Sequence, residues 1–351
     1  MRINIVTVFK SENCGSFLQA WALKETLSAM GNSVCFCNYK STGNTPTKRA
    51  INVIKCCLRF RFKRASDILK KTADFKKQQK KLRVVSNGES ADLYFFGSDT
   101  LWNFADAFFA QNAAFFTGEN VKDPCFAYSM SMGSTSKETV LAQSEAVKSI
   151  QKFKGIAVRD GHTWDVLSEI YPCNDMVRTV DPTMLMDKEA YISNFSNANS
   201  CAEKSLVVYY FGAIPENLWR ALQGFAQKKG LTIINVGLHG DRAAPSVVAS
   251  PVNFISAFAN AEYIFTNTFH GCVFSTIFNK PFATNGIHKK KIEGFLEEFS
   301  LLDRVVSDAS EIATVLTTPV EYERVNALIK EKRDASIEYL DRCIREVKGL
   351  E

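Results

Sequence analysis

Short apolar runs and amphipathic stretches alternate along most of this chain. The apolar runs are rich in β-branched and aromatic side chains, and small polar residues follow many of them. This pattern is typical of strands buried in a sheet. It predicts strands within residues 3–9, 34–39, 92–96, 124–134, 155–160, 177–186, 206–211, 231–237, 263–267 and 281–284.

Between these runs, apolar residues recur at helical spacing. They predict amphipathic helices over 17–30, 162–171, 215–229, 251–260, 271–278, 291–302 and 321–350. Alternation of strand and helix is typical of α/β folds, and 351 residues suffice for two domains. We therefore expect two Rossmann-like domains facing a cleft, a GT-B-like arrangement, with a C-terminal helix. The boundaries we expect are an N-terminal domain at 1–191 with a basic insertion at about 48–83, a linker at 192–204, a C-terminal domain at 205–318 and the helix at 319–351.

Residues 261–283 hold the most informative stretch. A predicted strand ends at Asn267, and Thr268, Phe269 and His270 lead through a glycine into a predicted helix. Ligands of open α/β sheets bind at the carboxyl ends of strands, beside helix N-termini whose free N–H groups attract anions. A lone histidine is more often a core residue, but Gly271 permits close backbone approach and polar groups cluster here. We interpret His270 as a functional residue.

Small polar residues follow other predicted strands as well. The first strand leads into a loop with Asn13 and Gly15, and a later one into Gly97, Ser98 and Asp99. Such loops either form simple turns or place backbone amides against a ligand. Trp102 is either a platform that stacks on a sugar or a core residue.

An arginine follows the predicted strand at 155–160. Arg159 at the end of a strand suits carboxylate or phosphate binding, and a surface pair with Asp160 is the alternative. We expect Asp160 and Asp181 to cap turns or hold loops rather than to catalyse.

Several common sites have no sequence signal here. There is no G-x-G-x-x-G or Walker A pattern, no C-x-x-C pair and no D-x-D pair, so we expect no nucleotide fingerprint, zinc ribbon or divalent metal. No stretch resembles a signal peptide or a membrane span. We therefore expect a cytoplasmic protein whose ten cysteines are free thiols.

The net charge of +6 is unevenly distributed. Residues 48–83 hold fourteen Lys or Arg against two Asp, which leaves a negative balance on the rest. Part of this segment could be one face of an exposed helix. A solvated surface insertion is the simplest interpretation, and attraction to anionic lipid at the inner face of the membrane, or to an anionic acceptor, is the functional one. No nucleic-acid module accompanies the charge, so we expect no nucleic-acid partner.

Together these landmarks resemble the polysaccharide pyruvyl transferase family over nearly the whole chain. The resemblance rests on five motifs in order: N-x-G-S-F-L-Q-A-W-A-L at 13–23, G-S-D-x-x-W-N at 97–103, A-V-R-D at 157–160, D-P-T at 181–183 and T-N-T-F-H-G-x-V-F-S-x-x-F-N-K-P-F at 266–282. The sequence departs from the family pattern after the last motif, where it has His288 followed by Lys289, Lys290 and Lys291.

The resemblance implies an activity and roles for the site residues. Family members move a pyruvyl group from phosphoenolpyruvate onto two hydroxyls of a sugar, in a polysaccharide or its lipid-linked precursor, and need no further cofactor. His270 is then the expected general acid, since histidine suits proton transfer near neutral pH. The expected phosphoenolpyruvate-binding residues are Arg159, Asn267, Thr268 and Gly271, and those lining the acceptor side of the cleft are Asn13, Gly15, Ser98, Asp99 and Trp102.

Two other functions remain open from the sequence. The same fold could serve a glycosyltransferase that uses a nucleotide sugar, with the diphosphate at a helix N-terminus. Alternatively, the chain could be a catalytically inactive protein that binds a sugar or polyanion through its basic segment.

Overall fold

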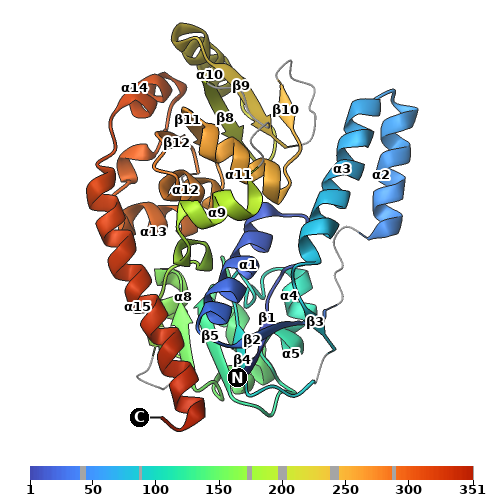
Figure 1. Cartoon of the computed structure of the whole chain (residues 1–351), viewed down its shortest axis with the longest axis vertical. Helices are drawn as coiled ribbons and strands as arrows, with labels where there is room; N and C mark the ends of the chain where they lie inside the picture. The colour runs from blue at the N-terminus through green and yellow to red at the C-terminus, as the bar shows by residue number, and fades with distance from the viewer. Residues whose placement is uncertain are drawn as a thin grey trace.

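Two parallel sheets with helices packed around them make up the computed structural model (Figure 1). It describes residues 1–39, 45–86, 89–171, 176–196, 204–237, 245–286 and 290–350. The N-terminal sheet has the order β3-β2-β1-β4-β5-β6-β7, from β1 Arg2–Val6, β2 Ser33–Cys37, β3 Val84–Val85, β4 Leu93–Phe96, β5 Cys125–Met130, β6 Gly155–Val158 and β7 Met176–Arg178. The C-terminal sheet has the order β10-β9-β8-β11-β12, from β8 Ser205–Tyr209, β9 Thr232–Val236, β10 Ser246–Val247, β11 Tyr263–Thr266 and β12 Phe282–Thr284.

The predicted fold class is confirmed, because both sheets are parallel and helices connect their strands. The helices of the N-terminal half are α1 Cys14–Ala29, α4 Ala107–Gln111, α5 Ala113–Phe116, α6 Lys137–Leu141, α7 Ser144–Ile150 and α8 Gly161–Ser168, with the 3-10 helix η1 Pro182–Leu185. Those of the C-terminal half are α9 Lys188–Phe195, α10 Glu216–Lys229, α11 Pro251–Asn260, α12 Phe269–Ile277, α13 Lys290–Glu298 and α14 Ile312–Thr317, with the 3-10 helices η2 Leu302–Arg304 and η3 Ala309–Glu311.

Helix α1 differs from its predicted amphipathic character. Every residue from 14 to 23 is buried, because the helix contacts β2 on one side and η1 and α11 on the other. A helix buried all round has no polar face. The two halves therefore meet along α1.

The predicted linker at 192–204 begins as helix. α9 continues to Phe195, and 197–203 lie outside the described residues. Trp21 of α1 packs against Tyr191 and Phe195 of α9, and Tyr191 packs against Phe274 of α12 at ring centroid distances of 5.5, 4.8 and 5.0 Å. One apolar cluster thus continues from the N-terminal sheet into the C-terminal half.

The terminal helix α15, Tyr322–Lys348, runs along both halves (Figure 1). Near its start, Tyr322 Oη donates to the Lys280 carbonyl beside β12 (2.5 Å). Near its end, Tyr339 Oη donates to the Ala127 carbonyl of β5 (2.9 Å). The helix therefore ties the two sheets together. No helix in the described part of the chain has the length and apolar character that crossing a bilayer requires.

The basic segment forms a helical hairpin, α2 Pro46–Leu58 and α3 Phe62–Gln79, which projects from the body at the upper right of Figure 1. The sequence indicated part of α3 but not α2. Its base is anchored where Phe75 packs on Phe17 of α1, with ring centroids 6.3 Å apart. The insertion is thus a helical hairpin whose base is packed against the N-terminal half.

Candidate active site

Three of the predicted site residues, from both halves of the chain, approach the Asp181 carboxylate with their side chains. Arg159 Nη1 donates to Asp181 Oδ2 at 2.7 Å, and His270 Nε2 lies 3.7 Å from the same oxygen. Ser98 Oγ reaches it at 3.4 Å. We call Arg159, Asp181 and His270 the shared-carboxylate cluster. At 3.7 Å the contact between His270 and Asp181 is too long for a hydrogen bond and is an ion pair only when the ring carries a proton.

The topology explains the convergence. Arg159 comes directly after β6, and Asp181 comes shortly after the neighbouring β7. His270 is the second residue of α12, which follows β11 of the other sheet. The carboxyl ends of parallel strands lie at the same edge of a sheet. The cluster therefore lies where the carboxyl-end edges of the two sheets meet.

His270 packs against the start of α1. A Cβ added to Gly15 would stand 2.0 Å from His270 Nδ1, so only glycine leaves room for the ring. Asn13 caps α1, since its Oδ1 accepts from the N–H groups of Gly15 (2.9 Å) and Ser16 (3.4 Å). Asn13 and Gly15 thus shape the wall beside His270.

The loop after β4 completes that wall. Gly97 has a φ of +117°, and a Cβ there would stand 2.1 Å from the Tyr128 carbonyl oxygen, so the turn requires glycine. Ser98 is fully buried. Asp99 Oδ2 accepts from Ser16 Oγ at 2.7 Å, which joins this loop to α1.

The polar residues ahead of α12 hold local structure. Thr268 is the N-cap, and its Oγ1 accepts from the Gly271 N–H at 2.9 Å. The Asn267 amide accepts from the Phe211 N–H (2.8 Å) and donates to the Phe211 carbonyl (2.9 Å). Binding of phosphoenolpyruvate by Gly271 stays a prediction, and in this conformation the Gly271 N–H donates to Thr268. Asn267 and Thr268 position the loop and the helix that carry His270.

The interpretation of Trp102 as a cleft residue is also wrong. Its side chain is fully buried, its Nε1 donates to the Phe116 carbonyl at 2.9 Å, and its ring packs edge-on against Phe153. A ring enclosed in this way cannot stack on a sugar. Trp102 is part of the core behind the loop that carries Ser98.

The carboxylate of Asp181 is held in its charged form. Burial by itself would raise the pKa of Asp181, but His270, then Arg159 and Thr183, outweigh burial and hold that pKa well below its usual range. Asp181 Oδ1 accepts from the Thr183 N–H at 3.0 Å and from its hydroxyl at 2.7 Å. Asp181 therefore stands as a fixed negative charge beside His270.

Arg159 is more enclosed than a solvent-facing anion clamp. It is buried, and its guanidinium lies 4.6 Å from the centroid of the Phe269 ring. The pocket on its far side, towards α13, measures only about 20 Å³, room for about one water molecule. Among the described residues, buried Arg159 Nε and His270 Nε2 have no hydrogen-bond partner. Both nitrogens are buried polar groups whose hydrogen-bonding capacity is not used in this conformation.

The sequence missed the second role of Asp181. The prediction that Asp160 and Asp181 cap turns is confirmed, since Asp160 Oδ1 accepts from the Thr163 N–H at 2.8 Å at the start of α8 and Asp181 caps η1. The other carboxylate oxygen of Asp181, Oδ2, lies between Arg159 and His270. The sequence signal for this role was the position of Asp181 shortly after a predicted strand. His288 and Lys289 lie outside the described residues, and Lys290 and Lys291 begin α13.

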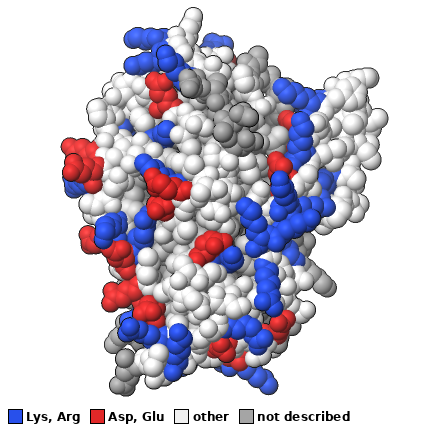
Figure 2. Space-filling model, viewed as in Figure 1, with Lys and Arg blue, Asp and Glu red and all other residues white. Residues whose placement is uncertain are grey.

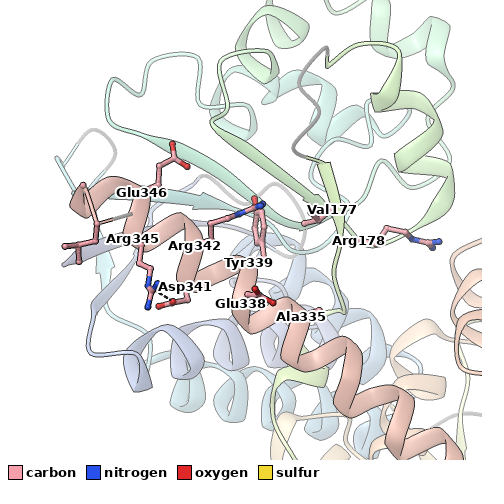
Figure 3. A pocket seen from close by; sticks show the side chains of 11 residues that line it. Val177, Arg178, Ala335, Glu338, Tyr339, Asp341, Arg342, Arg345 and Glu346 are labelled. Atoms are coloured by element: carbon pink, nitrogen blue, oxygen red, sulfur yellow. Dashed lines mark ion pairs between the residues drawn. The ribbon is translucent and has the colours of Figure 1, made fainter.

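A larger cavity, about 910 Å³, lies between β7 and α15 and includes none of the cluster (Figure 3). Its charged lining is mixed, with Arg345 paired to Asp341 at 2.9 Å. None of the buried side-chain atoms that lack a hydrogen-bond partner in the described residues belongs to its lining. Within the described ranges, no group of three or more His, Cys, Asp or Glu is arranged to hold a metal ion.

The sequence of this chain matches the model of the family described as polysaccharide pyruvyl transferase over residues 13–284. The chain belongs to the polysaccharide pyruvyl transferase family. The match contains all three residues of the shared-carboxylate cluster and the loops that pack around it. No curated protein matches the chain.

Two solved structures of similar fold are named as UDP-GlcNAc 2-epimerases. The UDP-GlcNAc 2-epimerase of Neisseria meningitidis bound to UDP-GlcNAc is 12% identical, with a TM-score of 0.54 over 99% of this chain and 100% of its own. The UDP-GlcNAc 2-epimerase of Methanocaldococcus jannaschii in complex with UDP-GlcNAc and UDP is 11% identical, with a TM-score of 0.52 over 99% of this chain and 100% of its own. At this identity the likeness shows the GT-B-like fold and nothing of the substrate.

Proposed function

We propose that the chain transfers the pyruvyl group of phosphoenolpyruvate to two hydroxyls of a sugar in a polysaccharide or its lipid-linked precursor. The products are a cyclic ketal and phosphate. The observation that carries the proposal is the shared-carboxylate cluster, in which a histidine from one sheet and an arginine from the other meet one buried aspartate in a chain of this family.

Charge around His270 suits an anionic donor. Phosphoenolpyruvate carries a carboxylate and a phosphate, so its site needs positive charge. When the His270 ring is protonated, it and Arg159 carry two positive charges against the one negative charge of Asp181. The N-terminal ends of α1 and α12 both lie beside His270, and helix N-termini favour anions. This arrangement supports binding of the donor on the side of His270 that remains accessible.

The reaction moves two protons, and one group can serve both steps. The first sugar hydroxyl attacks C2 of phosphoenolpyruvate, its proton is removed, and C3 gains a proton to become a methyl group. The second hydroxyl then replaces phosphate at C2, and its proton leaves with the phosphate. His270 is the residue we assign to deliver and accept these protons.

Asp181 and Arg159 assist from behind the ring. The Asp181 carboxylate is a fixed negative charge 3.7 Å from Nε2 of the His270 ring and packs on the side of the ring away from Gly15. Arg159 keeps Asp181 ionised through a hydrogen bond of 2.7 Å and adds positive charge towards the donor. In this role Arg159 contributes to donor binding mainly through charge, because it is buried.

Ligand stabilisation tests the proposed donor. A ligand that binds only the folded state raises the unfolding free energy, by about 2.7 kcal/mol at a hundredfold excess over its Kd. We expect phosphoenolpyruvate to raise the melting temperature and UDP-GlcNAc to leave it unchanged. Stabilisation by the nucleotide sugar alone would replace the proposal with a glycosyltransferase or epimerase activity. Stabilisation by neither would oppose the proposed donor.

A further inference from the structure

The helical hairpin carries an exposed apolar edge that the proposed reaction does not use. Ile51, Ile54 and Leu58 recur along one face of α2 and are 44%, 56% and 74% exposed. None of the residues of α2 is buried. At the turn, Phe60 is 83% and Phe62 61% exposed, and their rings contact edge-on at 6.2 Å. Monomeric proteins seldom expose apolar side chains in such continuity.

Positive charge lies next to the same edge. The turn sequence Leu58 to Arg64 interleaves leucine and phenylalanine with Arg59, Arg61 and Lys63. Figure 2 shows Lys and Arg gathered along the inner side of the hairpin and at its base, while the outer edge formed by α2 carries few of them. The segment 48–83 has fourteen basic residues and two acidic ones. A basic helical element with phenylalanine and leucine on the other face is the pattern of helices that lie in a membrane interface.

The hairpin is also fixed relative to the candidate active site. Glu12 Oε1 accepts from Arg49 of α2 and from Thr72 of α3, each at 2.8 Å. Glu12 directly precedes Asn13, which caps α1 beside His270. Whatever the hairpin docks on is therefore held at a defined position relative to the shared-carboxylate cluster.

We propose that the hairpin docks this protein on an anionic lipid bilayer, with Leu58, Phe60 and Phe62 entering the interface and the flanking basic side chains contacting lipid headgroups. Charge complementarity selects this partner, because apolar insertion alone explains the exposed edge but not the excess of positive charge around it. The inference goes beyond the proposed function and does not depend on it. Binding to a bilayer can be measured without the sugar acceptor or the phosphoenolpyruvate donor.

Vesicle sedimentation tests the docking. The full chain is mixed with vesicles of phosphatidylcholine alone, or of phosphatidylcholine with about one-third phosphatidylglycerol, at about 0.1 M and about 1 M salt. We expect binding to the anionic vesicles at low salt, loss of binding at high salt, and none to neutral vesicles. Absence of binding to anionic vesicles, or equal binding to both compositions, would overturn the proposal.

Two variants separate the apolar and basic contributions. We expect the variant with Leu58→Ser, Phe60→Ser and Phe62→Ser to bind anionic vesicles with an affinity lower by a factor of about ten or more. The matched control, Leu141→Ser with Leu302→Ser, changes side chains that are 50% and 53% exposed elsewhere and should bind as the unaltered chain does. Equal binding of the two would overturn the assigned face.

The charge variant has its own control. Lys55→Gln, Arg59→Gln and Lys63→Gln should weaken binding, whereas Lys228→Gln with Lys229→Gln on the exposed end of α10 should not. The alternative occupant of the apolar edge is a second copy of this chain. If the unaltered chain has twice the monomer mass in solution and the Leu58, Phe60 and Phe62 variant has the monomer mass, the edge is a site of self-association and the proposal is overturned.

Discussion

The histidine at the centre of the site is held between a backbone and a carboxylate. Gly15 leaves room for the His270 ring on one side, and Asp181 faces its Nε2 at 3.7 Å on the other. A catalytic group must be held close to its productive position, and a displacement of about 1 Å can cost on the order of a hundredfold in rate. The contact with Gly15 therefore offers a way to test the position of the ring separately from its chemistry.

Gly15→Ala should displace the ring. The new Cβ would stand 2.0 Å from His270 Nδ1, so the imidazole or α1 must shift. We expect turnover to fall by about a hundredfold and the free energy of unfolding by about 1–3 kcal/mol. Activity assays and urea denaturation measure both. The matched control is Gly224→Ala in α10, where a Cβ meets nothing within 4 Å; it should leave turnover unchanged. Full turnover in Gly15→Ala would show that the ring position does not matter.

Asp181→Asn should unfold more easily at neutral pH. It leaves the buried Arg159 without its charge partner, and breaking a buried pair in this way costs about 3–5 kcal/mol. Because the folded pKa of Asp181 is lowered, its stabilising effect is complete above the ordinary carboxyl value of about 3.9. The effect is lost as pH falls below that value towards the folded pKa.

Urea denaturation across pH gives the check on Asp181. The difference in unfolding free energy between the unaltered chain and Asp181→Asn should be present at pH ~5 and shrink as pH falls below ~4. The exposed Asp165→Asn in α8 should change stability by less than about 0.5 kcal/mol. A difference that does not shrink below pH ~4 would mean that Asp181 is not a stabilising charge.

At the residue scale, sequence reasoning reached His270 and Arg159 because each lies within a few residues of the end of a readable strand. It could not reach the contact between Asp181 and His270. These residues belong to different sheets, so their proximity depends on how the two halves pack, which no local pattern encodes. Trp102 was ambiguous for a related reason, since its burial is decided by Phe153 and Phe116 from other elements.

At the scale of elements, α15 supports the strand end that carries Asp181. Ser336 is fully buried, its Oγ accepts from the Val180 N–H at 3.0 Å and donates to the Lys332 carbonyl at 2.7 Å. Val180 immediately precedes Asp181. The terminal helix thus fixes the backbone from which the carboxylate projects.

Ser336→Ala should lower the free energy of unfolding by about 1–3 kcal/mol, since it leaves the buried Val180 N–H without an acceptor. Denaturant unfolding measures this loss. Ser193→Ala, which removes an exposed helix hydroxyl from α9, is the control and should change little. Equal stability of the two variants would show that α15 does not support this strand end.

Helical periodicity predicted α10, α11 and α15 closely because each buries one face, and it also predicted α12, which is buried on all sides except at His270. It misjudged α1, because neighbouring elements cover residues 14–23 of this helix on every side. It also missed α2, whose apolar face has no partner in the fold. A helix whose apolar face packs on no other element of the described structure is hard to tell from a solvated loop.

At the scale of the whole molecule, the alternation of strand and helix was enough to predict two parallel sheets in a GT-B-like arrangement. It was not enough to predict that the halves share an apolar cluster and close around Asp181. Both halves contribute to the site, and the hairpin lies at one side of it (Figure 1). The central claim is that this whole arrangement transfers a pyruvyl group and that His270 delivers and accepts the protons.

Phosphate release from phosphoenolpyruvate tests that claim most directly. The full chain is assayed with a panel of galactosides, mannosides and N-acetylhexosamines, beside His270→Gln and the control His162→Gln, whose ring contacts the Thr135 carbonyl outside the cluster. We predict acceptor-dependent release that persists in His162→Gln and falls by about 10²–10⁴-fold in a folded His270→Gln. Release at an unchanged rate by His270→Gln would contradict the role of this residue. Absence of release with every acceptor, together with no stabilisation by phosphoenolpyruvate, would contradict the proposed reaction.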